Sequence, residues 1–406
     1  MDQIHIKAFK KGVILKNTVV KTDNELVKYI KEVGESNFKK CFQCGTCSAV
    51  CPLSTEDRPF PRKEMIMAGW GMKEQLVSDL DPWLCYYCGE CSKNCPRKAE
   101  PGELMMSLRR FLISAYDWTG ISKLLYKSKY AEYIAILIVA LGVLIEWAVL
   151  FGLHPAAGAT LGQAVSPDKI DYYFDWPITV FLGVMLTSFI YNMFRKTVLS
   201  DAGVKIPLKL YFTEAWSLMF NFFTQYRYAK CDDSEGTSSK KLTEGKYNFW
   251  LTHLFLMISY VILFVGIVFF LDWFQDENSL PYLHIILFDY FASIGLIFGT
   301  VYFMIKRLTK KIERSKFSHH TDWMFVILLF LTGVTGVLLR ASIVYNYSVS
   351  AIFYIYLVHL MILFPMLVIE VPFSKWSHLA YRPVAIYFAN LKEKAKSLNN
   401  ENAEIS

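Results

Sequence analysis

Eight of the nine cysteines in this 406-residue chain form two copies of one pattern. The copies are Cys41-x2-Cys44-x2-Cys47-x3-Cys51-Pro52 and Cys85-x2-Cys88-x2-Cys91-x3-Cys95-Pro96. In this spacing, three cysteines of one run bind one 4Fe-4S cluster and the fourth binds the neighbouring cluster. The pattern therefore predicts two adjacent clusters and electron transfer. The first would be held by Cys41, Cys44, Cys47 and Cys95, and the second by Cys85, Cys88, Cys91 and Cys51.

Two other uses of cysteine fit this pattern poorly. Disulfides are disfavoured because thiolates that bind metal need a reducing compartment, and the ninth cysteine, Cys231, has no obvious partner. Zinc sites usually take four ligands from two separated pairs, whereas each run here is compact and ends in Cys-Pro. Iron–sulfur clusters remain the best interpretation.

The rest of the sequence is apolar enough to enter a membrane. Hydrophobic residues make up 54% of the chain and charged residues only 19%, and the long uncharged stretches all follow Lys129. A helix needs about 20 residues to cross about 30 Å of hydrocarbon. Six stretches are long enough: Tyr130 to Phe151, Trp176 to Phe194, Tyr247 to Leu271, Pro281 to Ile305, Asp322 to Arg340 and Ser350 to Val371.

Basic residues predict the orientation of these spans. Residues 195–246 contain nine Lys or Arg and residues 306–320 contain six, whereas the segments on the other side contain Lys169 and the boundary residue Arg340. This bias predicts a multi-pass protein of the cytoplasmic membrane, with the cysteines and both chain ends in the cytoplasm. The start, Met1 to Lys11, lacks the apolar core of a signal peptide, which agrees with that orientation.

Histidine is the second source of chemistry. Four of the eight histidines lie in or next to the predicted spans: His253, His284, His359 and His378. Titratable side chains at this depth are costly and usually functional, and paired imidazoles from neighbouring helices explain them as ligands of haem b. By depth, we pair His253 with His378 for an inner haem and His284 with His359 for an outer haem. For each single histidine, the alternative is a hydrogen bond to a nearby hydroxyl or carbonyl.

The remaining histidine evidence limits the haem type and the choice of ligands. No Cys-x-x-Cys-His motif is present, which excludes a covalent c-type haem. His319 and His320 precede the fifth span and are expected to be interfacial anchors, or substitutes for His378 if the last helix ends early. One helix would carry both His359 and His378, and Pro365 and Pro372 can kink it between them.

We therefore predict an all-α fold in three parts. Residues 1–120 form a helical ferredoxin-like domain with two 4Fe-4S clusters, residues 121–380 form a six-helix transmembrane cytochrome b bundle, and residues 381–406 form a cytoplasmic tail. Asp23 is a candidate N-cap of an early helix, and strand signals are confined to about the first twenty residues. The apolar segment Ile206 to Tyr228 contains three charged residues, so we expect an interfacial helix there and not a seventh span.

Two segments near the end of the chain carry a family resemblance. His359-x5-Pro365 and Phe373-Ser374-Lys375-x2-His378 resemble the last haem-bearing helix of the cytochromes b that form the gamma subunit of nitrate reductases. The cysteine patterns resemble those of the C subunit of heterodisulfide reductase. A chain that joins both resembles the membrane-embedded C subunit of quinone-interacting membrane-bound oxidoreductase complexes of sulfur-metabolising microbes. It departs from the nitrate reductase cytochromes at Leu263, where those proteins place another haem ligand.

The resemblance implies particular partners. It implies electron exchange with menaquinone or another quinone, flavin-containing soluble A and B subunits, and a link to adenylylsulfate reductase. The sequence itself has neither Gly-x-Gly-x-x-Gly nor a Walker loop, so flavin or nicotinamide would have to come with partners, and we expect no nucleic-acid partner. Basic residues beside the cysteines can steer an acidic partner, offset the charge of the clusters, or simply be solvated: Lys39, Lys40, Arg58, Arg62, Lys63, Lys93, Arg97 and Lys98.

A quinone site also needs a group that exchanges protons. Asp289 and Glu146 are the candidates, because both are ionisable residues at membrane depth, although pairing with a tyrosine hydroxyl would explain either one equally well. The expected function is that of an electron-transfer subunit in a quinone-dependent oxidoreductase. Two alternatives stay open: the membrane subunit of a heterodisulfide-reductase-like or sulfite-reduction-linked complex, and a membrane protein that senses redox state.

Overall fold

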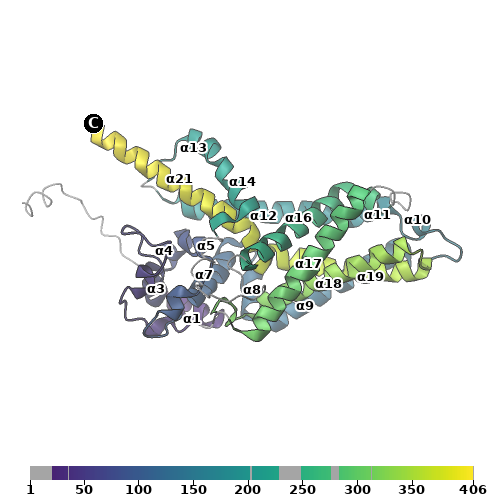
Figure 1. Ribbon diagram of the computed structural model, residues 1–406, viewed down its shortest axis with the longest axis horizontal. Coiled ribbons are helices and arrows are strands. Elements are labelled where there is room, and N and C mark those ends of the chain that lie inside the picture. Colours follow the sequence, from purple (N-terminus) through teal and green to yellow (C-terminus); the bar gives the residue numbers. More distant parts are fainter. Residues whose placement is uncertain are drawn as a thin grey trace, which may run out of the picture.

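A computed structural model describes residues 21–34, 36–201, 204–227, 248–275, 283–311 and 313–405. Within these ranges the chain is helical and contains no strand, which confirms the all-α prediction. The predicted strand signals of the first twenty residues lie outside the described residues, and so does Cys231. Two bodies follow one another along the chain: a compact domain that carries the eight paired cysteines, and a bundle of long helices (Figure 1).

The first body, here called the cluster domain, is built from short helices around one core. Its helices are α1 (Asn24–Glu32), α2 (Thr46–Ala49), α3 (Arg62–Trp70), α4 (Lys73–Ser78), α5 (Asp81–Leu84), α6 (Glu90–Lys93), α7 (Pro101–Tyr116) and α8 (Ile121–Lys127). The carboxylate of Asp23 accepts a hydrogen bond from the Leu26 amide at 3.1 Å, so the predicted N-cap is present. Helix α7 crosses the core, and its Leu104, Leu108 and Leu112 are fully buried.

The second body contains six helices that are long and apolar enough to cross a membrane, as the sequence predicts. They are α9 (Lys129–Phe151), α12 (Trp176–Phe194), α16 (Asn248–Gln275), α17 (Leu283–Thr309), α18 (His320–Val344) and α19 (Val349–Pro365). The second span is longer than predicted. Helices α10 (Leu161–Ala164) and α11 (Pro167–Ile170) and the π-turns η3 (Asp171–Asp175) and η4 (Arg195–Leu199) extend α12 at its two ends.

The chain after α19 is not one continuous helix. It continues through the π-turn η8 (Met366–Glu370), the short α20 (Val371–Phe373) and the 3-10 turn η9 (Lys375–Ser377) before α21 (His378–Ile405) begins. The break falls at Ser374, whose backbone is extended with φ −126° and ψ −151°. Pro365 ends α19 and Pro372 lies in α20, so the prolines predicted to kink the helix lie on both sides of its π-turn.

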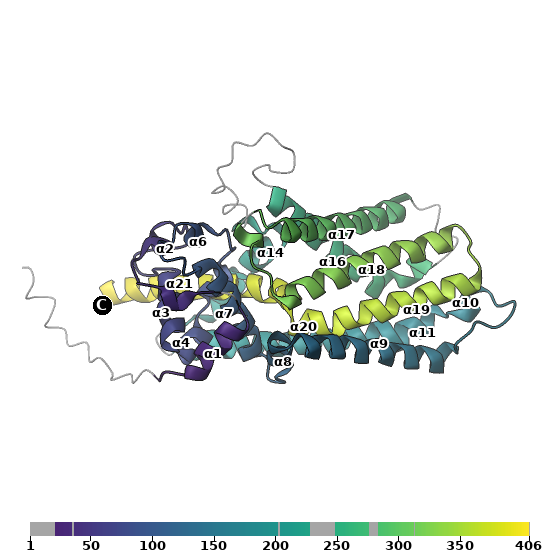
Figure 2. The ribbon, with the colours of Figure 1, turned by 90° about the horizontal axis from the view of Figure 1, so that it is seen from below.

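The cluster domain lies at one end of the bundle, here called the cluster end, and α10 lies at the far end (Figures 1 and 2). Helix α21 runs from the bundle past the cluster domain, and Tyr381 packs on Trp83 with ring centroids 5.1 Å apart. The described part of the predicted tail, residues 381–405, is thus part of a helix that joins both bodies. Residues 206–227 contain two short helices, α13 (Leu208–Thr213) and α14 (Ala215–Thr224), which pack beside α21.

Candidate iron–sulfur and haem sites

The two cysteine runs fold into the same loop. In each copy, the backbone N–H two residues after the first cysteine donates to the sulfur of that cysteine at 3.3 Å. The same two positions of each loop adopt a left-handed backbone: Gln43 (φ 59°) and Gly45 (φ 84°), and Tyr87 (φ 57°) and Gly89 (φ 90°). The residue four positions after the first cysteine is glycine in both copies, as this backbone favours. Helices α2 and α6, which follow the loops, contact each other.

The loops bring cysteines of both runs together. A cavity of about 350 Å³ is lined by Cys41, Cys44 and Cys47 of the first run and by Cys95 of the second. In the other set, Cys91 interacts electrostatically with Cys85, Cys88 and Cys51, and less strongly with Cys47 of the first set; Cys51 interacts with Cys85 and Cys88. The two groups contain the same residues as the two crossed ligand sets expected from the spacing. The ligand assignment remains a prediction, and this geometry supports it.

Burial makes it harder for several of these cysteine thiols to lose their protons. Desolvation raises the pKa of Cys47 to about 11, and the neighbouring Cys41 contributes to the rise. Desolvation likewise raises the pKa of Cys51 to about 12 and that of Cys91 well above the ordinary value. A bound metal cation would stabilise the thiolate charge at these positions. The donor set therefore fits two iron–sulfur clusters.

The residue after the first cysteine distinguishes the two loops. In the first loop this residue is Phe42, which is 69% exposed and lies under the guanidinium of Arg97 at 4.0 Å from the ring centroid. In the second loop it is Tyr86, which is 7% exposed and lies under Arg382 of α21 at 4.2 Å. The first loop therefore presents an aromatic ring to the surroundings, and the second presents one to the bundle.

His253 of α16 and His378 of α21 face each other at the cluster end, with ring centroids 6.3 Å apart. Metal–imidazole bonds are about 2 Å long, so two rings that bind one metal from opposite sides have centroids roughly 6 Å apart. The Nδ1 atom of His253 donates to the Gln225 side-chain oxygen at 2.7 Å, and that of His378 donates to the Lys375 carbonyl. Histidine ligands usually donate their second nitrogen in this way, so His253 and His378 are residues that would be able to hold the iron of a haem.

This histidine pair lies directly beside the second cysteine loop. His253, His378, Tyr86 and Arg382 line one cavity of about 400 Å³. The guanidinium of Arg382 donates to the carbonyls of Trp83 at 3.3 Å and Cys85 at 2.8 Å. One side chain thus connects the backbone of the second cysteine run with the wall of the histidine cavity.

A larger cavity of about 1260 Å³ lies within the far half of the bundle. His359 lines it, and the Nδ1 atom of His359 is 2.8 Å from the Thr335 hydroxyl. Most of the other lining residues are aliphatic or aromatic, as in a site for an apolar ring system. Tyr260 also lines this cavity and packs on Trp376, two residues before His378, at 5.1 Å. The apolar lining suits an apolar ring system, and His359 offers one imidazole to it; a haem at this position remains a prediction.

The other predicted site residues are distributed as follows. His284 and Asp289 lie in α17 at positions whose side chains are outside the described part of the structure, so both predictions remain untested. Glu146 is half-buried on α9, and it is not among the described residues that line the large cavity. His319 begins the turn before α18, and His320 Nε2 donates to the Leu125 carbonyl at 2.9 Å. Neither lies in the His253–His378 cavity as described.

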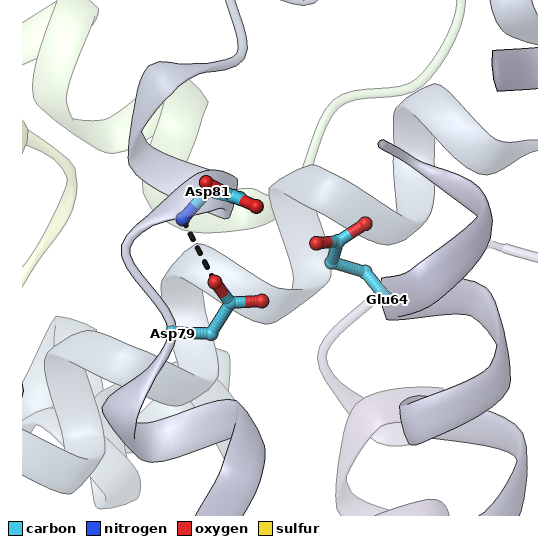
Figure 3. A group of neighbouring side chains, drawn as sticks. All are labelled: Glu64, Asp79 and Asp81. Carbon is cyan, nitrogen blue, oxygen red and sulfur yellow. Dashed lines mark hydrogen bonds between the residues drawn. The ribbon is translucent and has the colours of Figure 1, made fainter. Parts of the chain in front are cut away.

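Three carboxylates of the cluster domain, Glu64, Asp79 and Asp81, converge as a metal site would (Figure 3). The Lys63 ammonium already contacts all three, at 3.2 Å from Glu64, 3.2 Å from Asp79 and 2.7 Å from Asp81. Although burial alone would lower it, Asp79 and the other carboxylates raise the pKa of Lys63. Lysine occupies the position of a cation, so the cluster is best explained as an internal ion pair.

Sequence reasoning did not identify the charged residues that join the two bodies. Asp322 of α18 is 4% exposed, and its carboxylate forms ion pairs with Arg110 of the cluster domain at 3.0 Å and with Lys375 at 2.9 Å. Arg110 also pairs with Glu103 at 3.2 Å. Lys375 could have been noticed because it belongs to the segment with the cytochrome resemblance. Tyr86, beside the inner histidines, could have been noticed by comparing the two cysteine runs, where it stands in the position of Phe42. Arg110 and Arg382 give no such signal in the sequence.

Comparisons with known proteins agree with the geometry of the cysteine loops. Residues 37–99 match the family model of the 4Fe-4S dicluster domain. The chain is 31% identical over 118 residues to a protein of Archaeoglobus profundus that is named as similar to the C subunit of heterodisulfide reductase, covering 28% of this chain and 63% of that protein. It is 36% identical over 63 residues to the C subunit of the H2:CoB-CoM heterodisulfide, ferredoxin reductase of Methanothermobacter marburgensis and to that of Methanothermobacter thermautotrophicus, covering 15% of this chain and 34% of each relative.

The matches describe only part of each protein. This chain spans less than two thirds of the length of these relatives, and the family model covers the cluster domain alone. No solved structure matches the chain. Residues 37–99 therefore form a 4Fe-4S dicluster domain, and the chain carries an iron–sulfur part like that of the C subunit of heterodisulfide reductase next to six helices long enough to span a membrane.

Proposed function

We propose that this chain is the membrane subunit of an oxidoreductase complex, and that it passes electrons between membrane quinone and soluble cytoplasmic partners. The supporting observation is a row of sites through both bodies. The first cysteine set lies beside the exposed Phe42 and the second set beside Tyr86. Tyr86 lines the cavity of His253 and His378, and the His359 cavity lies beyond it in the bundle. Adjacent sites of this kind suit stepwise electron transfer.

The residues of this row would hold four groups. When bound, two 4Fe-4S clusters and two b haems would supply the one-electron carriers. The two cysteine sets would hold the clusters, His253 and His378 the inner haem, and His359 and His284 the outer haem. Tyr86 and Arg382 fill the space between the second cysteine run and the inner histidines, so they exclude water there and fix the distance between the two sites.

The exposed end of the row is the proposed contact with soluble subunits. Phe42 is 69% exposed, and the exposed side chains of Lys39, Lys40, Arg97 and Lys98 surround the first cysteine set. A basic rim around an aromatic residue suits a partner with an acidic surface, because complementary charge steers association. We propose flavin-containing A and B subunits as these partners, on the resemblance to quinone-interacting oxidoreductases. A link to adenylylsulfate reductase and sulfur metabolism belongs to the same proposal.

The quinone would exchange electrons at the membrane part, with Asp289 and Glu146 as candidate proton carriers. The orientation proposed with it places the cluster domain in the cytoplasm, where the segments rich in Lys and Arg also lie. A quinone headgroup is an apolar ring with two polar oxygens, and a site at the edge of the large apolar cavity would match that chemistry.

Oxidation of reduced clusters by quinone tests this function. The chain would be purified in nanodiscs, reduced with dithionite, freed of excess reductant and mixed anaerobically with a menaquinone analogue. Electron paramagnetic resonance would follow reoxidation of the clusters. We expect the rate to fall at least tenfold in His378→Ala, because that variant removes a ligand between clusters and quinone.

The matched control is His154→Ala, because His154 is exposed and bonds only to the Tyr354 hydroxyl among the described contacts. This control should reoxidise at the wild-type rate. Equal rates in His378→Ala and wild type would contradict the proposed route. Clusters that quinone does not oxidise even in the wild type would contradict the function itself.

A further inference from the structure

Two glutamates that the electron route does not use lie buried against each other. Glu132 is on α9, and Glu370 is the last residue of the π-turn η8; both are 0% exposed. Their side chains interact directly across the contact between α9 and η8. Among the described residues, their four carboxylate oxygens have no hydrogen bond of ordinary geometry, and the Ser374 side chain also interacts with Glu370. Isolated π-turns of this kind often occur at functional sites.

Among the described residues, the group at ion-pair distance from this pair is His320, 3.8 Å from Glu132, and its imidazole carries a charge only when it is protonated. The nearest charged groups on the packed elements are His320 and Asp322 of α18 and Lys375 of η9, and the Tyr126 hydroxyl of α8 and the Ser374 hydroxyl complete the surroundings. Lys375 already pairs with Asp322 at 2.9 Å, and Asp322 also takes Arg110 at 3.0 Å. Two carboxylates buried side by side repel each other when both are ionised, and a shared proton would relieve that repulsion. The geometry therefore suits a proton-binding pair.

A cavity at the cluster end reaches His320, which lies beside this pair. His319 and His320 line a cavity of about 770 Å³ between the two bodies, together with Glu32, Tyr126 and Lys127. The side chain of His320 is 21% exposed, and its Nε2 atom lies 3.8 Å from Glu132 Oε2. Because Nε2 donates to the Leu125 carbonyl, Nδ1 can accept a proton from the cavity while Nε2 releases one to Glu132.

On the other side of the pair, a short segment of backbone leads to the inner histidines. Ser374 follows Glu370 by four residues, and its amide donates to the Glu370 carbonyl at 3.3 Å. The next residue, Lys375, accepts the Nδ1 hydrogen bond of His378 with its carbonyl. Glu370 and His378 are eight residues apart, and Glu370, Ser374 and Ser377 in this segment are 0% exposed, so a charge at the inner histidine site would be weakly screened from the carboxyl pair.

We propose that Glu132 and Glu370 form a redox-linked proton-binding site that is filled from the cytoplasmic side through His320. This inference rests on the proposed function, because the electron arrives at the inner histidine pair. For each electron that arrives there from the cysteine sets or from quinol, one proton passes from water through His320 to the carboxyl pair. The proton leaves by the same route when the electron departs, so charge and protons balance without a further reactant.

Redox-difference infrared spectroscopy of the purified full-length chain tests the site. We expect reduction to produce a carboxylic C=O band that shifts in D2O and is lost in Glu370→Gln and in Glu132→Gln. A tenfold change in proton concentration should shift the midpoint potential of the inner haem by about 59 mV if one proton accompanies one electron. That slope should disappear in Glu370→Gln while haem content is retained. A band and a slope that persist in both variants would overturn the proposal.

Two controls sharpen this test. Glu214→Gln removes another buried carboxylate, but Glu214 pairs with Lys394 and should contribute no carboxylic band, so this variant should keep the band and the slope. His320→Gln should keep the band but slow its appearance after reduction at least tenfold, because proton entry is impaired. Unchanged kinetics in His320→Gln would overturn the entry route.

Failure of the electron route can be distinguished from failure of the proton site. A pH titration of the oxidised chain by infrared spectroscopy reports the carboxyl pair without any redox step. A carboxylic band at neutral pH that disappears in Glu370→Gln, in a preparation without haem, would retain the pair and contradict the proposed function. A preparation that contains haem but shows no carboxylic band, and whose haem midpoint potential does not change with pH, would agree with the proposed function. It would contradict the proposed proton site at Glu132 and Glu370.

Discussion

The buried Asp322 gives a sharp prediction about how the two bodies hold together. Its carboxylate pairs with Arg110 of the cluster domain at 3.0 Å and with Lys375 at 2.9 Å, and Asp322 and Arg110 are each 4% exposed. Replacing Asp322 with Asn keeps the shape and removes the charge. The variant leaves two cations facing each other with no carboxylate between them, inside a region that excludes water.

The magnitude follows from these distances. With an effective dielectric constant of about 20, Coulomb's law gives roughly 5 to 6 kcal/mol for each pair. Loss of hydration offsets much of this attraction, and breaking a buried pair by removal of one partner typically costs about 3–5 kcal/mol. We therefore expect Asp322→Asn to lower the free energy of unfolding by about 3–5 kcal/mol, mostly at the contact between α7 and α18.

Hydrogen–deuterium exchange in nanodiscs measures this effect locally, because amides of α7 and of the start of α18 should exchange faster in the variant. The matched control is Lys127→Gln. Lys127 pairs with Glu32 at the similar distance of 2.9 Å, but the two side chains are 40% and 37% exposed. An exposed pair contributes only about 0–1 kcal/mol. Equal effects of the two substitutions would refute the argument from burial.

Three further outcomes follow from the cluster domain. Burial and the neighbouring Asp79 raise the pKa of Glu64, so its protonated form stabilises the fold, and this contribution is lost as the pH rises above the ordinary pKa of 4.5. In thermal unfolding, Glu64→Gln should therefore lose less stability than the wild type as the pH rises. Gly45→Ala should cost about 1 kcal/mol for its positive φ, and Gly89→Ala more in the same assay, because a Cβ there would lie 2.6 Å from Glu313. Phe42→Ala should change stability little but weaken binding of acidic soluble subunits, measured by calorimetry.

The sequence predicted the repeated and periodic features of this chain well. The two cysteine runs have the same spacing, and their loops adopt the same backbone conformation. The family comparison confirms that residues 37–99 form a dicluster domain. A long uncharged stretch in a membrane must form its backbone hydrogen bonds internally, as a helix does, and the described residues contain six helices of this kind. Both features depend on local chemistry, which is why they can be recognised without any three-dimensional information.

Features that depend on distant contacts were not predicted. Spacing alone does not indicate that the helix after His359 breaks at Ser374, or that His378 begins a new helix that packs on the cluster domain. The pairing of Arg110 with Asp322 joins residues 212 positions apart. Glu132 and Glu370 read as ordinary charges near the ends of spans, and only their shared burial indicates a proton site.

The content of metal cofactors in the purified chain tests the electron route most directly. Pyridine haemochrome would count b haem, and a colorimetric assay would count non-haem iron per polypeptide. We predict two b haems and about eight non-haem irons, four for each of two clusters. Two clusters with a single haem would contradict the pairing of His284 with His359, and a chain with clusters but no haem would contradict electron transfer through the bundle.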